Sequence, residues 1–463
     1  RRAAFAMAWC GCAVALCLLP FVLIVVLALA LRLHRGLRKK RVVAFLHPYC
    51  AAGGGGERVL WVGVAALHKV VGNSHRIVVY TGDCESREEV FAGVLKKFGV
   101  TVPSDVELCR LQSRELLEAK CYPVATLVGQ SLGSVLLALE AVCKTVPDVF
   151  VDTTGLAFTY PVAAGLCGAR VAAYVHYPTI STDMISAVSE RKPAFNNAAM
   201  WSTQYGALVK LAYYRLFAKA YSKAGACANV AMANGSWTRG HVQALWGGRV
   251  QLVYPPCGTM ALEDAEYQNG ALQKRKRVVV SLAQFRPEKD HALQLAAWAL
   301  LPAAVRANAK LVIAGGVRNA DDALIVAQLR KDCANRKLHD SVEFLISAPR
   351  EAIADLLRTA SVGLHTMRLE HFGIALVEMM ACGVIPVAHA SGGPLLDIVG
   401  ESKTRGLLAT DAESYAAALA KLLALSDEKL GEMRLTAAAH VRDRYADETF
   451  GKAFVAALAP LIQ

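Results

Sequence analysis

Short apolar runs alternate with helix-length segments along most of the chain after Arg41. Continuous Val, Ile and Leu runs separated by such segments are typical of parallel sheets with crossover helices. A first series of predicted strands comprises Val42–Leu46, Arg76–Thr81, Asp148–Asp152, Ala172–His176, Ala228–Ala233 and Gln251–Tyr254. A second series comprises Arg277–Leu282, Lys310–Ala314, Ser341–Leu345, Ser361–Leu364 and Val384–Ala388. The pattern predicts two doubly wound α/β domains that bind ligands at the carboxyl ends of their strands.

A polar stretch from Glu263 to Lys276 separates the two series and contains no predicted strand. With 463 residues, the chain is long enough for more than one domain of ~100–200 residues. We therefore expect an N-terminal Rossmann-like domain over residues 42–260, a linker over 261–276 and a C-terminal Rossmann-like domain over 277–440. A C-terminal helix over 441–463 is expected to return to the N-terminal domain.

The segment from Ala3 to Leu31 contains no charged residue. A helix that crosses the hydrocarbon core needs ~20 apolar residues, and Pro20 is tolerated in such a helix. A cleaved signal peptide is the alternative, although its apolar core usually has only ~7–15 residues. We expect residues 1–41 to form a single transmembrane helix with a basic flank.

Basic residues flank this segment unequally. Arg1 and Arg2 precede it, whereas the following residues come after it: Arg32, Arg35, Arg38, Lys39, Lys40 and Arg41. Because the more basic flank stays in the cytosol, the part of the chain after Arg41 is predicted to be cytosolic. The basic residues of that flank are expected to lie against anionic lipid headgroups.

The formal net charge of +13 is compatible with nucleic acid, an anionic membrane surface or a phosphorylated substrate. The sequence contains no zinc finger, RRM signature or other nucleic-acid module. A membrane surface and diphosphate ligands therefore explain the charge, and we expect no nucleic-acid partner.

Two further apolar stretches each leave two interpretations open. Pro123 to Val142 carries a single charge and is interpreted either as a second membrane span or as a helix buried beside a sheet. Ala199 to Lys223 combines aromatic and basic residues on different faces. That pattern fits an interfacial membrane helix and, equally, an ordinary amphipathic core helix.

Four glycines, Gly53–Gly56, follow a predicted strand and precede a helix that starts near Glu57. Without Cβ atoms the backbone can approach a ligand closely, and a helix N-terminus favours an anion. The segment is not a Walker loop, because Glu57 and Arg58 stand where Lys and Ser or Thr would follow.

Two glutamates, Glu370 and Glu378, flank a turn at Gly373 and the start of a predicted helix. A ligand at that turn meets free backbone N–H groups, and Glu378 lies about one and a half turns further along the helix. A carboxylate is a natural acceptor for a pair of sugar hydroxyls, so this arrangement suits a nucleotide sugar. The following Ser391–Pro394 turn is interpreted either as part of the site or as a simple connection between strand and helix.

Further candidates lie at predicted strand ends. His176 ends a strand, where it is interpreted either as a structural or as a functional residue. Arg286 and Lys289 follow the first strand of the second series, with Pro287 between them. Two cations at that edge would neutralise the charge that develops on a leaving diphosphate.

Four segments together resemble one known family: Val43–Trp61, Tyr174–Met184, Gln284–Asp290 and Glu370–Glu378. The family is the GDP-mannose-dependent α-1,2-mannosyltransferase of the dolichol-linked oligosaccharide pathway (the asparagine-linked glycosylation 11 family). The resemblance implies a retaining glycosyltransferase of the GT-B class, with two facing Rossmann-like domains. Its substrates would be GDP-mannose and a dolichol-diphosphate-linked oligosaccharide at the cytosolic face of the endoplasmic reticulum membrane. Other mannosyltransferases of the pathway are candidate partners.

The resemblance also implies residue roles. Glu370 and His176 would contact the transferred mannose, and Glu378 would hold the ribose hydroxyls. Phe372, Gly373 and Ile374 would contact the sugar and the diphosphate. The glycines Gly53–Gly56 would line the site near the diphosphate and the acceptor. In the same segment as His176, Asp183 is a candidate for binding acceptor hydroxyls.

The chain departs in three places from the usual pattern of the family or its superfamily. Gln284 stands where the broader superfamily has an arginine, so Arg286 is expected to replace it. Leu395 stands where the family has a lysine, and Ala51 and Ala52 precede the glycines where an asparagine is usual. The last two departures concern acceptor contacts more than donor contacts.

No metal site or cofactor is expected. No Asp-x-Asp sequence lies at a strand end, and Asp321 and Asp322 are placed to cap a helix. The thirteen cysteines lack zinc-type spacing and are expected to be reduced thiols. Two other functions stay open: an inactive scaffold subunit of a membrane glycosylation complex, and a GT-B transferase with another donor or lipid acceptor.

Overall fold

The computed structural model describes residue 19 and residues 22–189, 204–258 and 275–463, which form two compact units. The first unit comprises the residues up to Ala233, together with Thr238–Val253 and Gly451–Gln463. The second unit comprises Asn234–Trp237 and Tyr254–Phe450. The predicted linker, 261–276, lies almost entirely outside the described residues.

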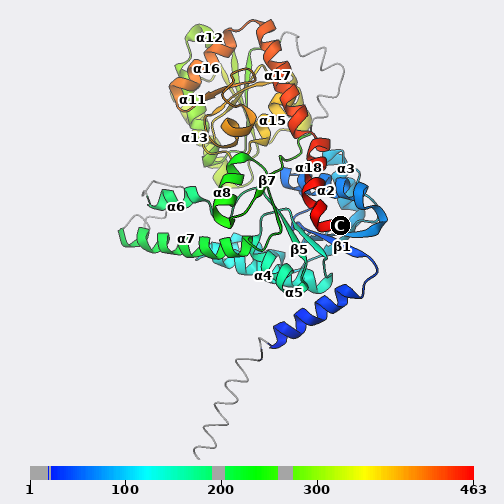
Figure 1. The fold of residues 1–463 in the computed structure, drawn as a ribbon. Coiled ribbons are helices and arrows are strands. Elements are labelled where there is room, and N and C mark those ends of the chain that lie inside the picture. The colour runs from blue at the N-terminus through cyan, green and yellow to red at the C-terminus, as the bar shows by residue number, and fades with distance from the viewer. Residues whose placement is uncertain (1–18, 20–21, 190–203, 259–274) are drawn as a thin grey trace, which may run out of the picture. The chain divides into compact units, whose positions relative to one another are not determined.

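The first unit contains a seven-stranded parallel sheet in the order β3-β2-β1-β4-β5-β6-β7 (Figure 1). Its strands are β1 (Arg41–Leu46), β2 (His75–Thr81), β3 (Glu107–Arg110), β4 (Val149–Asp152), β5 (Arg170–Val175), β6 (Val230–Ala233) and β7 (Val250–Leu252). Its helices are α2 (Gly55–Val71), α3 (Arg87–Phe98), α4 (Thr126–Lys144), α5 (Tyr160–Cys167), α6 (Thr182–Ser189), α7 (Gln204–Gly225), most of α8 (Ser236–Trp246) and the end of α18 (Asp447–Ile462). The strand order reverses between β1 and β4, which places a ligand-binding crevice at their carboxyl ends.

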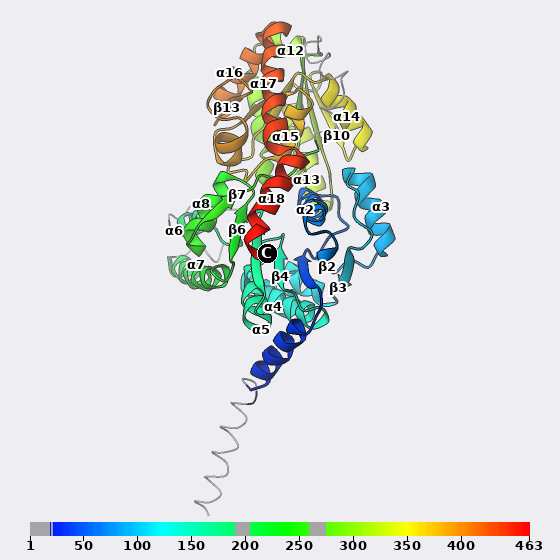
Figure 2. The same cartoon turned by 45° about the vertical axis from the view of Figure 1, so that its right-hand side comes forward.

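Alternating side chains of β1 build the two layers of this unit. Val42, Ala44 and Leu46 belong to a core with residues of α4, α5 and α7. Phe45 faces the opposite layer, where its ring stacks on Phe454 of α18 at 6.3 Å between ring centroids. Figures 1 and 2 both show α4, α5 and α7 on one side of the sheet and α2 and α18 on the other.

The second unit contains a six-stranded parallel sheet in the order β10-β9-β8-β11-β12-β13. Its strands are β8 (Val278–Leu282), β9 (Lys310–Gly315), β10 (Val342–Ile346), β11 (Val362–His365), β12 (Ile385–His389) and β13 (Leu407–Ala409). Its helices are α11 (His291–Leu300), α12 (Ala303–Ala307), α13 (Ala320–Asn335), α14 (Arg350–Thr359), α15 (Ile374–Ala381), α16 (Ala412–Ala424) and α17 (Asp427–Tyr445). Here the order reverses between β8 and β11.

A buried carboxylate ties two separate segments into the second unit. Asp397 is 2% exposed and accepts hydrogen bonds from the Ser236 backbone N–H at 2.8 Å and the Ser236 hydroxyl at 2.6 Å. The Tyr254 hydroxyl donates to the same carboxylate at 2.8 Å. Both donors precede the rest of this unit in the sequence, so their contacts explain why Asn234–Trp237 belongs to it.

The structure contains every strand that the sequence predicted, and it adds the short edge strands β3 and β13. The expected C-terminal helix over 441–463 is instead the end of α17 followed by α18, with Ala446 in extended conformation between them. Gly451–Gln463, the last part of α18, belongs to the first unit.

The predicted transmembrane segment lies largely outside the described residues, but residues 22–36 are helical. Leu27 and Leu31 of this helix pack against the core of the first unit. Val22–Val26, in contrast, are exposed. Among the described residues, α4 is the one helix long and apolar enough to cross a membrane, and 39% of its most apolar window is buried.

Candidate active site

The carboxyl edge of the second sheet brings together the loops that follow β8 and β11. Thr366, directly after β11, donates its hydroxyl hydrogen toward the backbone oxygens of Lys289 at 2.8 Å and Asp290 at 3.0 Å. Gln294 of α11 donates to the same hydroxyl oxygen at 3.0 Å. Residues that are ~80 positions apart in the sequence are thereby fixed at the switch point of the sheet.

Glu370 is the centre of this edge. Its Oε2 accepts from Lys289 Nζ at 2.6 Å and from His365 Nε2 at 3.2 Å. Lys289 Nζ also lies 3.0 Å from the sulfur of Met367. Burial alone would raise the pKa of Glu370, but the His365 hydrogen bond and the Lys289 charge outweigh it and lower the pKa to about 2. Glu370 is therefore an ionised, oriented carboxylate at neutral pH. We call Lys289, His365 and Glu370 the Glu370 cluster.

The Ser391–Pro394 turn supports the backbone of this cluster. The Gly393 N–H donates to the Glu370 carbonyl at 2.8 Å, and the Ser391 hydroxyl accepts from the Leu369 N–H at 2.8 Å. A Cβ on Gly392, which has a φ of +58°, would lie 2.3 Å from the Glu370 carbonyl oxygen. This turn is therefore more than a connection between strand and helix. Its contacts hold the Glu370 loop in place.

The helix α15 starts where the sequence analysis placed it. Gly373 has a φ of +105° and precedes Ile374, the first helical residue. Glu378 lies on an exposed position of this helix. Phe372, in contrast, has a buried side chain that packs against Tyr254 and Tyr445, so a ligand reaches this residue through its backbone.

Arg286 and Lys289 differ in their partners. Lys289 is engaged by Glu370, whereas Arg286 has a weak ion pair with Glu288 at 3.7 Å. Its Nε has no hydrogen-bond partner within the described part of the chain. Arg286 thus carries a guanidinium with donors left for an anion.

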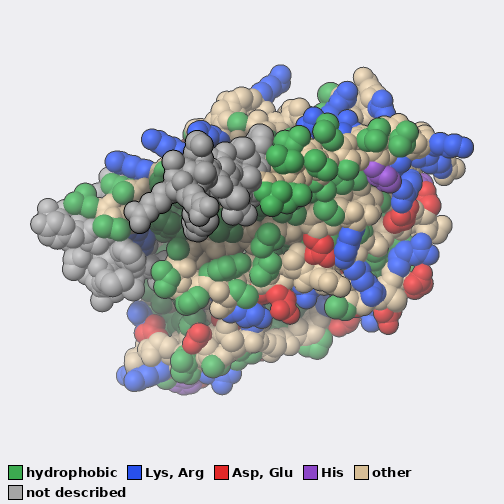
Figure 3. All heavy atoms as spheres, turned by 90° about the horizontal axis from the view of Figure 1, so that it is seen from below, with side chains coloured by type: hydrophobic (Ala, Val, Ile, Leu, Met, Phe, Trp, Pro, Cys, Tyr) green, Lys and Arg blue, Asp and Glu red, His purple; other side chains and the backbone are tan. Residues whose placement is uncertain are grey.

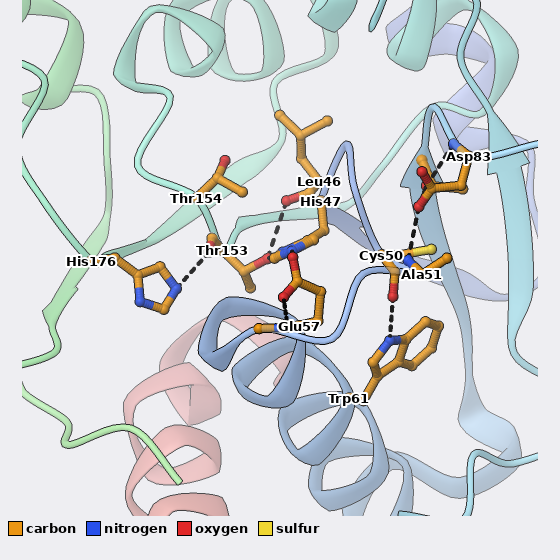
Figure 4. Close-up of polar contacts among 12 residues, drawn as sticks. Leu46, His47, Cys50, Ala51, Glu57, Trp61, Asp83, Thr153, Thr154 and His176 are labelled. Atoms are coloured by element: carbon orange, nitrogen blue, oxygen red, sulfur yellow. Dashed lines mark hydrogen bonds and ion pairs between the residues drawn. The ribbon is translucent and has the colours of Figure 1, made fainter. Parts of the chain in front are cut away.

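The carboxyl edge of the first sheet holds a second polar group, shown in Figure 4. His47, which follows β1, has its Nδ1 2.7 Å from the Thr153 hydroxyl and its Nε2 3.6 Å from Glu57 Oε1. The backbone oxygen of Thr153 lies 3.1 Å from His176 Nε2. We call these four residues the His47 cluster. Thr153 joins the strand ends that carry the two histidines.

His176 is held in one defined state. Because a carbonyl oxygen can only accept, its Nε2 carries the hydrogen and donates to Thr153. Burial, and then the charge of His47, lowers the pKa of His176 to about 4, so the ring is neutral at pH 7. Its Nδ1 is consequently an unprotonated acceptor.

The glycine segment lies against both histidines. A Cβ on Gly56 would be 3.6 Å from His176 Nε2 and 3.7 Å from His47 Cε1. Glu57 accepts from the Gly54 N–H at 2.7 Å. Burial alone would raise the pKa of Glu57, but the hydrogen bond and charge of His47, together with backbone N–H donors, lower it. The helix α2 begins at Gly55, slightly earlier than expected.

Three side chains hold the loop between β1 and α2. Trp61 donates to the Cys50 carbonyl at 2.9 Å, and Asp83 accepts from the Ala51 N–H at 2.8 Å (Figure 4). Lys97 reaches the Ala51 carbonyl at 2.7 Å. These hydrogen bonds hold the backbone directly before the glycines in place, although Ala51 and Ala52 replace the asparagine of the family pattern.

Two matches with family models cover most of the chain. Residues 40–246 match the model described as ALG11 mannosyltransferase N-terminus, and residues 263–439 match Glycosyl transferases group 1. A Xenopus laevis protein named GDP-Man:Man(3)GlcNAc(2)-PP-Dol alpha-1,2-mannosyltransferase is 44% identical over 92% of this chain and 89% of its own length. The chain belongs to the ALG11 mannosyltransferase family. The recognition made from the four motif segments is thereby confirmed.

Other members of the ALG11 family are similarly close. The Homo sapiens protein of that name is 42% identical over 92% of this chain and 88% of its own length. The Dictyostelium discoideum protein is 42% identical over 91% and 85%.

Solved structures support the fold of this ALG11-family chain. Anabaena HepE in complex with UDP and glucose has a TM-score of 0.60 at 17% identity, covering 91% of this chain and 99% of that one. Sucrose-phosphate synthase from Thermosynechococcus elongatus has a TM-score of 0.63 at 16% identity, with 91% and 99% covered. At these identities the likeness concerns the fold alone, and it confirms the GT-B class.

The structure adds residues that the sequence analysis missed in this ALG11-family chain. His365 and His47 stand directly at strand ends, one residue past the predicted strand in each case. Both histidines could have been found in the sequence, because each directly follows a predicted strand and so lies at the carboxyl edge of its sheet. His291 of α11 is 2% exposed, and neither ring nitrogen has a partner within the described residues.

Asp183 stays a prediction. Its carboxylate lies 3.3 Å from His241 Nε2, near the start of α6. Among the described residues, no group of His, Cys, Asp and Glu is arranged to hold a metal ion. The absence of a required metal or cofactor likewise stays a prediction.

Proposed function

We propose that the protein transfers mannose from GDP-mannose to Man3GlcNAc2-diphosphate-dolichol. It would add the fourth and fifth mannoses in α-1,2 linkage. The observation that carries this proposal is the 42–44% identity, over more than nine-tenths of the chain, to proteins named for that reaction.

The Glu370 cluster suits the donor. Arg286 and Lys289 would bind the diphosphate, and the N-terminus of α15, which follows Glu370 closely in the sequence, would offer backbone N–H groups to it. Glu378, on the exposed side of α15, would accept from the ribose hydroxyls. The Lys289 ammonium donates one hydrogen to Glu370 and one to the Met367 sulfur, so its third hydrogen would be available for a phosphate oxygen.

The reaction would retain the anomeric configuration. The ionised Glu370 would stabilise positive charge that develops on the mannose ring, while Arg286 and Lys289 stabilise the leaving GDP. We infer a displacement on one face of the sugar, in which the leaving phosphate accepts the proton of the acceptor hydroxyl. The unprotonated Nδ1 of His176 would accept a hydrogen bond from a sugar hydroxyl. Trapping a mannosyl adduct on Glu370 would contradict this mechanism.

The enzyme is proposed to act without a metal ion, because Arg286 and Lys289 supply the positive charge beside the diphosphate. Transfer should therefore persist in EDTA. Loss of transfer in EDTA, restored by Mg²⁺ or Mn²⁺, would contradict this part of the proposal.

The proposed location is the endoplasmic reticulum membrane, with a single transmembrane helix and both units in the cytosol. The names of the relatives include a dolichol-linked acceptor, which is a membrane lipid. A protease-protection assay on intact microsomes tests the orientation. Both units should be digested without detergent.

A transfer assay tests the activity. Labelled mannose from GDP-mannose should lengthen a phytanyl-diphosphate acceptor, which bears three mannoses and two N-acetylglucosamines, by one and then two mannoses. Glu378→Ala should weaken GDP-mannose binding, and Glu288→Ala, at an exposed position nearby, should not. Donor binding without transfer to any lipid acceptor would favour a scaffold, and preference for another sugar nucleotide would refute the donor.

A further inference from the structure

The helix at residues 22–36 docks onto the first unit through arginine side chains. Arg32 donates to the Gly165 carbonyl at 2.6 Å, and Arg35 donates to the Gly168 carbonyl, both at the C-terminal end of α5. Arg38 donates to the Val146 carbonyl at 2.6 Å and to Asp148 at 3.0 Å. Cations at a helix C-terminus satisfy its free carbonyl groups. These arginines therefore bind protein, whereas the sequence analysis expected them to face lipid headgroups.

Beside this docking point, α4 exposes an apolar stripe. Val124, just before the helix, and Val128, Leu132 and Leu136 follow one another at intervals of four residues, with exposed fractions between 37% and 82%. This spacing places them on one side of the helix. The opposite side, which includes Leu137, packs into the core of the first unit. Because one face of α4 packs into this core, the contacts favour the interpretation of α4 as a helix beside the sheet.

The helix α7 likewise has one exposed apolar face and one buried face. Leu208, Val209 and Leu216 are 58–71% exposed, whereas Phe217 and Tyr221 are buried and contact Phe158. Its C-terminal half exposes Arg215, Lys219 and Lys223. Exposed leucines beside lysine and arginine are typical of a helix that lies in the headgroup region of a bilayer.

These features lie on one side of the first unit. Helices α4 and α7 both pack against the turn Ala157–Thr159 and against α5, whose end binds the arginines. Figures 1 and 2 show the helix at residues 22–36 leaving the unit on this side. Figure 3, which views the molecule from below, shows hydrophobic side chains gathered there with Lys and Arg around them. We call the exposed residues of α4 and α7 the α4–α7 surface.

We propose that the α4–α7 surface is immersed in the headgroup region of the same bilayer that holds the N-terminal segment. This inference rests on the proposed function for its acceptor, which is a lipid. The chain itself argues for lipid as the occupant. Leu27 and Leu31 pack on the first unit, so the apolar segment reaches the domain without a flexible linker. Once that segment is in a bilayer, the neighbouring surface lies at its interface.

A photoactivatable lipid tests the contact directly. The full-length protein is reconstituted in phosphatidylcholine vesicles that contain phosphatidylinositol and a diazirine-bearing phosphatidylcholine, and labelled peptides are mapped by mass spectrometry. Labels are expected on Val124–Leu136 and on Leu208–Leu216. Leu300 and Leu324 of the second unit are matched controls, because they are 53% and 68% exposed and belong to no such stripe. Equal labelling of these controls, or no label on α4 and α7, would overturn the proposal.

A charged residue in the apolar stripe of α4 tests whether this stripe is needed for transfer to the lipid-linked acceptor. Leu132→Asp is expected to reduce transfer to the lipid-linked acceptor at least about tenfold, because a carboxylate enters the bilayer interface poorly. GDP-mannose binding and the melting temperature should not change, and Leu324→Asp should leave transfer unchanged. Unchanged transfer by the Leu132→Asp variant would count against the surface. Cross-links from α4 to another protein, without lipid labels, would assign the surface to a protein partner and overturn the proposal.

The two experiments separate this inference from the proposed function. Lipid labelling of α4 and α7 in a protein that transfers no mannose would refute the function and support the surface. Full mannose transfer without lipid labels would support the function and refute the surface.

Discussion

The carboxyl edges of the two sheets occupy equivalent positions, where β1 meets β4 and β8 meets β11, but their electrostatics differ. In the second unit, Glu370 has a pKa of about 2 and is held by the Lys289 ammonium. In the first unit, His176 has a pKa of about 4 and is neutral. One fold thus prepares a charged edge, suited to a diphosphate, and an edge with a neutral acceptor, suited to sugar hydroxyls.

The largest expected effect comes from removing the charge of Glu370. Glu370→Gln keeps the shape of the side chain but leaves Lys289 without its carboxylate. We expect a loss of about 10²–10³-fold in kcat for mannose transfer, the size typical of one preorganised electrostatic contact. Glu288→Gln, at an exposed position in the neighbouring loop, is the control and should remain active. If both variants keep full activity, the charge of Glu370 does not contribute to transfer.

Replacing His176 tests the neutral edge. His176→Gln should reduce kcat about 10²-fold. This is the lower limit of the effect that is typical of a side chain that exchanges a proton with the substrate in the transition state. Because its pKa is lowered to about 4, activity should show no acidic limb from this ring between pH 5 and 7. If activity falls with an apparent pKa near 6.5, and this fall is absent in the His176→Gln variant, then the protonation state of His176 changes near neutral pH, which would contradict the lowered pKa.

The same shift predicts an effect on stability. The unfolded chain binds a proton at His176 below about pH 6.5, whereas the folded chain resists protonation until about pH 4. The contribution of the neutral ring is therefore present above pH 6.5 and is lost as the pH falls from 6.5 to 4. Urea unfolding across this window should depend less steeply on pH in His176→Gln. An equal slope in both proteins would contradict the shift.

Gly392→Ala tests the support beneath Glu370. Its Cβ would meet the Glu370 carbonyl oxygen at 2.3 Å in a left-handed backbone conformation, which itself costs about 1–2 kcal/mol for a residue with a side chain. The Glu370 loop should shift, and transfer should fall about tenfold, because small misplacements in a site are costly. The matched control is Gly316→Ala, whose Cβ would have no atom within 4 Å. Equal activity in both would show that the turn does not position the carboxylate.

The smallest effect is expected for Glu57→Gln, the counterpart of Glu370→Gln in the first unit. Glu57 lies 3.6 Å from His47 Nε2 and accepts from the Gly54 N–H, so the loss in stability should be about 1 kcal/mol, as for one hydrogen bond. Its pKa is lowered, so this contribution is present above pH 4.5 and lost as the pH falls through the folded value. A loss of transfer as large as that of Glu370→Gln would remove the contrast between the two edges.

The sequence predicted the central strands well because their apolar runs are buried on both faces. Val42–Leu46 and Val384–Ala388 are examples in which almost every side chain is buried. The edge strands β3 and β13 were missed because they are short, and β3 is half exposed and ends in Arg110. Such a segment lacks the continuous pattern on which the prediction depends.

The site was predictable where a motif carries it and hidden where only tertiary contacts do. Glu370, Lys289 and the glycines stand in recognisable segments. In contrast, no local pattern indicates that Thr153 joins His47 to His176, or that Gly392 lies against the Glu370 carbonyl. Those contacts join residues from different strand ends, so they arise only when the parallel sheet forms.

The hydrogen bonds of Asp397 determine how this protein can be divided. An expressed fragment that began at Tyr254 would contain the buried carboxylate without Ser236, which supplies two of the donors described above. A buried acceptor that loses its partners costs about 1–3 kcal/mol or more when charged. Fragment studies and domain exchanges with related enzymes should therefore carry the short segment around Ser236 together with the C-terminal half. The C-terminal unit therefore cannot be separated from the N-terminal unit by a single cut in the sequence.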